Sequence, residues 1–377
     1  MRQNVMIWCG EHADQQLELL KQLAAIPAPS HQEHRRVEWI TAWLKDRGFP
    51  QVIVDEAFNV IVPFDVPEGG PYTVFMAHTD VVFPDLTPLP VKEENGRLYA
   101  PGVGDDTANV ASLMICAEYL LTHADEIKSP ILIVFNSCEE GLGNLKGVRQ
   151  ICKDYEGKIK ELISFDGTYE GIVSKAVGSE RWKVTCSTCG GHSYGAFGNP
   201  NAIAHLADLV VLLYSQPIPP VPDTKTTYNV GTISGGTSVN SIAQDAEMLY
   251  EYRSDDKDCL ETMRKQFEQA LEVLNGEDAV FRKELMGERP CMGDVDPKKM
   301  EELLERCSAV MEDFSGNRPL RRPSSTDANI PLSLGIPATC FGMYQGRGAH
   351  TREEYLEIDS LLTGLKIGLT IITEFCC

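Results

Sequence analysis

Residues 131–141 read ILIVFNSCEEG, an unbroken apolar run that ends in two adjacent acids, Glu139 and Glu140. Five consecutive apolar residues are typical of a strand that is buried on both faces, as in a parallel sheet covered by helices. Adjacent side chains at a strand end point in different directions, so one glutamate can bind a metal ion while the other faces a substrate. The segment therefore predicts an α/β fold with polar chemistry at the edge of its sheet.

The sequence on both sides of this segment alternates between helical and strand-like patterns. Helical spacing of apolar residues covers 14–23, 33–44 and 107–122, and strand-like runs cover 52–62, 72–77 and 161–165. After residue 297 the same alternation of patterns returns, with a helix over 298–314, a strand over 338–342 and a helix over 358–374. This order predicts a mainly parallel sheet with flanking helices.

The pattern changes between these two parts. Strand-like 181–188, helical 201–214, strand-like 227–233 and 246–253, helical 259–274 and strand-like 281–285 follow one another. The order β-α-β-β-α-β is that of a ferredoxin-like α+β domain, and about 110 residues suffice for an independent fold. We therefore expect one α/β domain, residues 1–178 and 290–377, that is interrupted by a smaller inserted domain at 179–289.

Composition and charge narrow the class of protein. The chain has 377 residues, 43% of them apolar and 24% charged, which are ordinary globular values. Its 34 basic and 55 acidic residues give a net charge of −21. A strongly negative protein repels phosphate backbones and anionic lipid, so neither nucleic acid nor a membrane surface is expected as a partner.

The expected compartment is the cytosol. No apolar run approaches the ~20 residues needed to span a bilayer, and the first residues lack the apolar region of a signal peptide. The 12 cysteines are spread along the chain without a compact framework, so they are expected to be reduced thiols.

Further acids and histidines fall just past other predicted strands. His78 and Asp80 end the strand at 72–77 and, being two residues apart, share one face of it. Asp166 ends the strand at 161–165. The remaining candidates are Asp105 and Asp106, directly before the helix at 107–122, and His350, after the last strand.

Because open α/β sheets place their ligands at the carboxyl ends of the strands, these side chains are expected to meet. Several crowded carboxylates would be costly without cations. Two divalent metal ions about 3.5–4 Å apart would neutralise them and support metal-assisted hydrolysis.

Three other motifs are disfavoured by their context. Cys186 and Cys189 form a CxxC pair, but no second pair or following helix completes a metal or redox site. The glycines at 141, 143 and 147 have the wrong spacing for a dinucleotide-binding turn and follow two glutamates that would repel a pyrophosphate. Residues 191–195, GHSYG, match the nucleophile elbow in letters, but a loop follows instead of a helix.

As an ordered set, the motifs resemble the dinuclear zinc family of acetylornithine deacetylase, succinyl-diaminopimelate desuccinylase, aminoacylase, glutamate carboxypeptidase and tripeptidase T. The likeness extends from about residue 23 to 373 and includes the inserted domain, which is the lid in that family. By this resemblance, two divalent ions are bound, zinc being expected and cobalt or manganese being alternatives.

The resemblance also implies a role for each residue of the metal centre. One ion would be held by His78 and Asp166, and the other by Glu140 and His350. Asp105 would bridge the two ions, and its bond to Asp106 would be a cis peptide. Asp80 would orient His78, and Glu139 would be the general base.

Three residues of the inserted domain match positions that contact substrate in the family. His192 would stabilise the oxyanion, while Asn240 and Arg253 would hold a substrate carboxylate, a group that the planar fork of arginine binds in bidentate fashion. The segment Ser324–Asn329 resembles one that lines the site. In relatives the lid often mediates dimerisation, so a homodimer through this domain is expected.

The substrate stays open between two classes. Asp166, where several deacylases have glutamate, and the tail after His350 favour a peptidase like tripeptidase T, acting on a small peptide with a free carboxylate. An N-acyl-amino-acid deacylase is the alternative, and a non-catalytic metal-binding scaffold is a third reading. Residues 101–104 (PGVG) and 107–108 (TA) stand where many relatives carry Gly-Arg-Gly and Lys-Gly. The ligand Asp105 itself is present, so metal binding is still expected, but the substrate preference of close relatives does not carry over.

Overall fold

The computed structural model describes residues 2–377. The chain divides into two compact units. The first unit contains the segment up to Ala176 together with Gly293–Cys377, and the second is Val177–Met292. Within residues 2–377, no helix has the length and apolar character needed to cross a bilayer.

A six-stranded sheet of order β1-β2-β6-β3-β7-β16 forms the centre of the first unit. Strands β6, β3, β7 and β16 run parallel, and β2 and β1 extend the sheet in antiparallel fashion. Every residue of β6 is buried, as the apolar run at 131–135 predicts. The strands are β1 (Ile53–Val54), β2 (Val60–Phe64), β3 (Tyr72–His78), β6 (Ile131–Asn136), β7 (Ile159–Phe165) and β16 (Ala338–Phe341).

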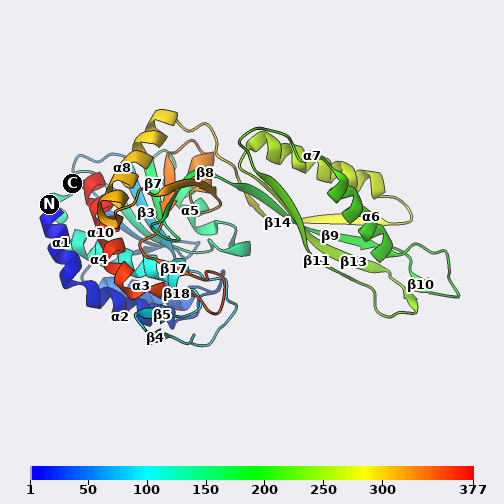
Figure 1. Ribbon diagram of the computed structural model, residues 1–377, viewed down its shortest axis with the longest axis horizontal. Helices are drawn as coiled ribbons and strands as arrows, with labels where there is room; N and C mark the ends of the chain where they lie inside the picture. The colour runs from blue at the N-terminus through cyan, green and yellow to red at the C-terminus, as the bar shows by residue number, and fades with distance from the viewer. Residues whose placement is uncertain (1) are drawn as a thin grey trace. The chain divides into compact units, whose positions relative to one another are not determined.

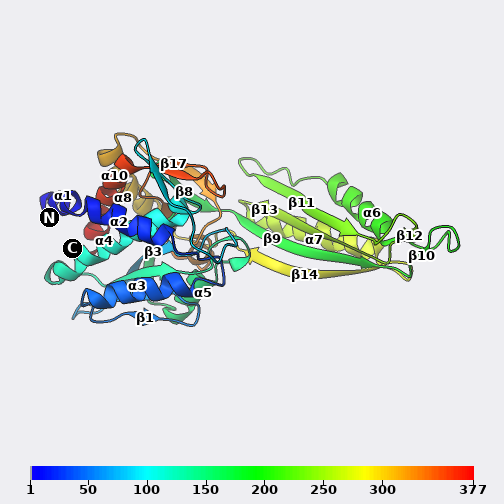
Figure 2. The ribbon, with the colours of Figure 1, turned by 90° about the horizontal axis from the view of Figure 1, so that it is seen from below.

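Helices cover both faces of this sheet (Figure 2). One face carries α4 (Asn109–Thr122), α8 (Pro297–Ser315) and α10 (Ile358–Cys376), with α1 (Arg2–Glu11) and α2 (Ala13–Ala24) packed against them. The other face carries α3 (His34–Asp46) and α5 (Lys146–Asp154). The expected mainly parallel α/β sandwich is therefore confirmed.

Residues 52–62 do not form the single strand that their composition predicts. The Asp55 side chain accepts hydrogen bonds from the backbone N–H groups of Ala57 and Asn59, both at 2.9 Å, and Phe58 adopts a positive φ of 69°. This local turn, made by a side chain that competes with the sheet for backbone donors, splits the segment into the antiparallel pair β1 and β2.

Several short elements of the first unit have no counterpart in the sequence prediction. Strands β17 (Gly346–Arg347), β18 (Tyr355–Glu357), β5 (Arg97–Tyr99) and β4 (Lys92–Glu94) form a small sheet in that order. Strands β8 (Gly171–Ala176) and β15 (Leu320–Ser324) pair in parallel, and a short helix, α9 (Asn329–Ser333), precedes β16.

The second unit has the β-α-β-β-α-β order expected for residues 179–289. Its sheet order is β11-β13-β9-β14, all antiparallel, which is the ferredoxin-like arrangement. Helices α6 and α7 lie on one face of that sheet (Figure 1) and enclose a core around Phe267 and Tyr250. The elements are β9 (Gly178–Ser187), α6 (Ala202–Ser215), β11 (Thr226–Gly235), β13 (Asp245–Ser254), α7 (Lys257–Leu274) and β14 (Val280–Arg289), with the short pair β10 (Gly191–His192) and β12 (Ser241–Ile242).

Candidate metal centre

The candidate residues of the first unit meet at the carboxyl ends of three adjacent parallel strands. His78 is the last residue of β3, Asp166 follows β7 directly, and Glu139 and Glu140 come after β6. Because β6, β3 and β7 are neighbours and parallel, their ends lie at one edge of the sheet. The apolar strands thus fix polar side chains that come from distant parts of the chain.

Asp105 lies between two imidazoles. Its Oδ1 is 3.1 Å from Nε2 of His78, and its Oδ2 is 3.1 Å from Nε2 of His350. The peptide bond from Asp105 to Asp106 is cis, as the resemblance implied. One carboxylate therefore presents each of its oxygens to a different histidine, which is the arrangement that a bridging ligand requires.

Potential metal ligands gather in two groups that share Asp105. Donor atoms of His78, Asp105 and Asp166 lie within 4.8 Å of one another, and so do those of Asp105, Glu140 and His350. A third group of His78, Glu139 and Glu140 meets the same limit. Imidazole nitrogens together with carboxylate oxygens are a donor set that divalent zinc accepts, so the residues present fit a dinuclear centre.

The electrostatics of the cluster show an excess of negative charge. Burial, reinforced by the charges of neighbouring carboxylates, raises the pKa of Glu140 to about 7 and that of Asp166 well above its usual value. Hydrogen bonds to Asp105 and Glu140 raise the pKa of His350 to about 11. The cluster thus retains protons that divalent cations would replace.

The carboxylate of Asp80 lies near His78 and also accepts hydrogen bonds from the loop after β6. Its Oδ1 lies 3.5 Å from Nδ1 of His78, whose closest partner is the backbone oxygen of Asp80 at 3.0 Å. The same carboxylate accepts hydrogen bonds from the backbone N–H groups of Glu139 and Glu140, both at 2.9 Å. The Asp80 carboxylate therefore lies near the histidine and fixes the loop that carries both glutamates.

Other buried polar residues hold the strand ends together; of these, Asp106 was a candidate from the sequence, whereas Asn109 was not. The Asp106 side chain accepts hydrogen bonds from the backbone N–H of His78 at 2.9 Å and from the amide of Asn109. Asn109 also accepts a hydrogen bond from the backbone N–H of Met343 at 2.6 Å. These contacts connect β3, the turn before α4 and the segment after β16, and the adjacent acids at 105 and 106 were the only signal of them.

Glu33 and Glu354 are buried acids that the sequence does not distinguish from surface acids. Glu33 accepts hydrogen bonds from the backbone N–H groups of Cys138 and His31, both at 3.0 Å. Cys138 directly precedes Glu139 in the chain. Glu354 accepts one from the backbone N–H of Asp105 at 2.8 Å. Each anchors a loop that carries candidate ligands.

The segment 324–329 reaches the same region. The Asp327 side chain accepts a hydrogen bond from Nδ2 of Asn136, the last residue of β6, at 2.7 Å. Burial and the charge of Glu139 raise the pKa of Asp327 to about 7. The segment is therefore close enough to the centre for its charge to matter.

In the second unit, His192 and Asn240 come together. His192 in β10 pairs with Ser241 in β12, and the backbone N–H of Ser193 donates a hydrogen bond to the backbone oxygen of Asn240 at 2.9 Å. The His192 side chain is exposed, and its Nδ1 accepts hydrogen bonds from the backbone N–H groups of Tyr194 and Gly195, both at 3.2 Å.

Arg253 does not join these two residues. It lies near the end of β13, whereas Asn240 precedes the start of that strand at Asp245. Eight residues of extended strand separate Asp245 from Arg253, about 26 Å at a rise of about 3.3 Å per residue. The Arg253 guanidinium makes two hydrogen bonds to the Glu251 carboxylate, at 3.0 and 2.9 Å. Within one chain, Arg253 and Asn240 cannot hold the same small substrate.

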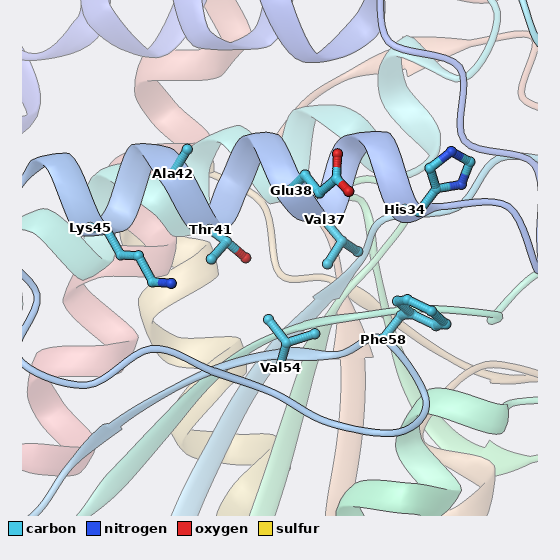
Figure 3. A pocket seen from close by; sticks show the side chains of 8 residues that line it. All are labelled: His34, Val37, Glu38, Thr41, Ala42, Lys45, Val54 and Phe58. Carbon is cyan, nitrogen blue, oxygen red and sulfur yellow. The ribbon is translucent and has the colours of Figure 1, made fainter.

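A separate depression lies against helix α3 (Figure 3). Apolar side chains of Val37, Val54 and Phe58 form much of its wall, with His34 and Lys45 at its margin. It contains none of the candidate site residues, so it is not part of the metal centre.

A mainly parallel sheet with two histidines and several carboxylates near its carboxyl edge defines a candidate metal centre of an α/β protein. The profile of the family described as Peptidase family M20/M25/M40 matches residues 74–374, and the chain belongs to this family. Its members are metal-dependent hydrolases that act on peptide or other amide bonds, and this chain is one of them.

Three proteins are similar to this chain in sequence or in fold. Acetylornithine deacetylase of Myxococcus xanthus is 24% identical over 363 residues, covering 90% of this chain and 92% of the relative. The structure of aminopeptidase PepT from Bacillus cereus has a TM-score of 0.73 at 20% identity, with 96% of this chain and 98% of that chain covered. The YXEP protein of Bacillus subtilis, described as a dinuclear metal binding peptidase, has a TM-score of 0.67 at 16% identity, with 97% and 99% covered.

Proposed function

We propose that the protein hydrolyses a peptide bond in a small peptide that carries a free carboxylate. The observation that carries this proposal is the shared position of Asp105 between two groups of metal-binding side chains, with Glu139 buried beside them. A shared carboxylate suits a two-metal centre, and a glutamate buried beside that centre suits a general base.

The residues that would hold the ions follow from the two groups. His78 and Asp166 would bind one divalent ion, Glu140 and His350 the other, and Asp105 both. The mixture of imidazole and carboxylate donors favours zinc, with cobalt and manganese as alternatives. When bound, such ions lower the pKa of water and stabilise negative charge on a carbonyl oxygen.

The protein's own residues would move the proton. Glu139 accepts the proton of the attacking water and returns it to the nitrogen of the leaving amine. Asp80 keeps the Glu139 backbone in place through its hydrogen bond at 2.9 Å. The position of the proposed base therefore depends on Asp80, which lies two residues past the end of β3.

The hydrogen bonds of His192 determine what it can offer a substrate. Its Nδ1 accepts two backbone hydrogen bonds, so in the neutral ring the proton resides on Nε2. An Nε2–H group is a donor, and we assign it to the oxyanion that forms on the scissile carbonyl. Asn240, adjacent to it, and Arg253 would bind the substrate carboxylate.

The positions of these residues support a homodimer through the second unit, which we assign as a lid. Because His192 in β10 and Arg253 at the end of β13 lie far apart in the second unit, one active site would need Arg253 from one chain and His192 from the other. In a symmetric dimer each subunit would supply the same residues to the other. The free state of all twelve cysteines supports a cytosolic location.

A second candidate activity is the deacylation of N-acyl amino acids. It is favoured by the likeness to acetylornithine deacetylase over 90% of this chain. The two activities share the same bond chemistry and differ in whether the substrate carries a free amino terminus.

The test is hydrolysis by metal-free protein that has been reloaded with Zn²⁺, Co²⁺ or Mn²⁺. The substrates are dipeptides, tripeptides and N-acetyl or N-succinyl amino acids, and released amine is measured. Metal-dependent cleavage of the unblocked peptides is the expected result. Cleavage of the acylated set alone would establish the deacylase, and no cleavage of any substrate by protein with two bound ions would refute both activities.

A further inference from the structure

Glu354 is a buried acid in an otherwise exposed loop. The four residues before it, His350 to Glu353, are exposed, whereas Glu354 is only 1% exposed. A carboxylate loses hydration energy on burial and is retained inside a protein only with strong partners. Its position therefore calls for a specific reason.

Three backbone amides of one turn surround this carboxylate. Oε2 accepts a hydrogen bond from the N–H of Gly102 at 2.8 Å, and Oε1 accepts hydrogen bonds from Gly104 at 2.9 Å and Asp105 at 2.8 Å. The turn is the one that places Asp105 between its two imidazoles. Both oxygens of Glu354 are thus used to hold the turn that carries the shared carboxylate.

The turn is also held from its other side. A Cβ atom at Gly104 would lie 2.6 Å from the ring of Tyr344, so a side chain larger than glycine does not fit there. Farther along, the Asp106 carboxylate accepts the hydrogen bond from the backbone of His78 at 2.9 Å. Between these contacts, the backbone of Asp105 has little freedom to move.

We propose that Glu354 is a positioning residue that fixes Asp105 for metal binding and ties it to the loop of His350, four residues earlier in the chain. This inference rests on the proposed role of Asp105 as the shared ligand. A bridging carboxylate must keep both oxygens in place for two ions at once. Hydrogen-bond partners that do not themselves bind the metal commonly fix the orientation of such a ligand. Glu354 does so through the backbone, without touching substrate or metal.

The test compares Glu354→Gln with Glu353→Gln, its exposed neighbour. The amide keeps the size of the side chain but turns one acceptor into a donor that faces a backbone N–H. Metal-free proteins are titrated with Zn²⁺ and with Co²⁺ against a competing chelator, and thermal unfolding is followed in parallel. We expect Glu354→Gln to bind at least one ion about 10–100-fold more weakly, while Glu353→Gln stays within about twofold of the wild type.

Folded Glu354→Gln that binds two ions as tightly as the wild type would overturn this inference and leave the proposed function standing. Wild-type protein that binds no ion would overturn both. If Glu354→Gln does not fold, amide hydrogen exchange in the metal-free wild type decides the matter. Slow exchange at Gly104 and Asp105 supports a clamp that exists before metal binding, and exchange as fast as in the exposed loop 351–353 would refute it.

Discussion

Asp80 accepts a hydrogen bond from the backbone of Glu139 at 2.9 Å while its other oxygen receives the backbone N–H of Glu140 at the same distance. A residue two positions past the end of β3 thereby fixes the loop that follows β6. The proposed base and a proposed metal ligand are oriented by one buried carboxylate, and this relationship leads to the first prediction.

Asp80→Asn should lower kcat about 10–100-fold, as the loss of an outer-shell partner typically does. An amide cannot accept both hydrogen bonds, because its NH₂ group would face a backbone N–H of the glutamate loop. The matched control is Asp46→Asn, at the exposed end of α3, which should retain wild-type rates. Wild-type kcat in Asp80→Asn would refute the role of Asp80 in holding the loop.

The two adjacent glutamates should respond differently to the same substitution. Glu139→Gln should retain two metal ions and lose about 10²–10⁴ in kcat, because the general base is gone. Glu140→Gln should lose one ion, measured by metal analysis after dialysis. Equal metal content and equal residual activity in the two variants would contradict the division of roles between them.

Mixing two inactive variants tests the shared site of the dimer. His192→Ala and Arg253→Ala should each be nearly inactive, but subunits exchanged between them should recover activity. In a mixed dimer one site would combine intact Arg253 with intact His192, so about a quarter of wild-type activity is expected from random pairing of symmetric dimers. No recovery after verified exchange would place both residues in the same subunit's site.

Control variants for this experiment are available in the same unit. His205→Ala removes a histidine of α6, and Arg282→Ala removes an exposed arginine of β14. Each should leave activity within about twofold of the wild type, as surface substitutions usually do. A large loss of activity in either control would show that the second unit is sensitive to substitution in general. In that case only activity regained in the mixed dimer would support the shared site.

Thiol labelling should follow burial. Cys189 is exposed and Cys377 partly exposed, whereas the other ten cysteines are buried. Burial raises the pKa of Cys9 and Cys152 to about 12, so almost no reactive thiolate is present at pH 8. A maleimide should therefore label two thiols in the native protein and twelve after unfolding, counted by mass spectrometry. More than two labels on the native protein would contradict the burial, and fewer than twelve after unfolding would indicate disulfides.

The parts of the fold that the sequence predicted are those with strong local signals. The apolar run at 131–135 is buried along its whole length in β6, and the amphipathic segment at 259–274 lies within α7. Strands with exposed or charged residues escaped prediction, such as β15, which contains Arg321, Arg322 and Pro323. Helix α1 buries only Val5 and Cys9 and so lacks a clear apolar stripe.

The same physics explains what could be found of the site. His78, Glu140 and Asp166 each stand just past an apolar strand and Asp105 just before a helix, where an acid or histidine is conspicuous. His350 lies in a loop and was found from the resemblance of the segment around it. Glu33, directly before α3, and Glu354, in the loop before β18, stand among other polar residues, and their burial arises only from tertiary packing. A sequence shows that a residue is acidic, but the partners that make it indispensable come from elsewhere in the chain.

The ends of the second unit are hydrogen-bonded neighbours. Ser179, near the start of β9, pairs with Arg289 at the end of β14, and the unit has its own apolar core. The chain therefore leaves and re-enters the first unit at almost the same point, as in insertions that a host fold tolerates. A short loop could replace the whole insert without changing the order or the connections of the strands in the parallel sheet. Evolution could thus exchange the proposed lid while the parallel sheet and its metal centre kept their connectivity.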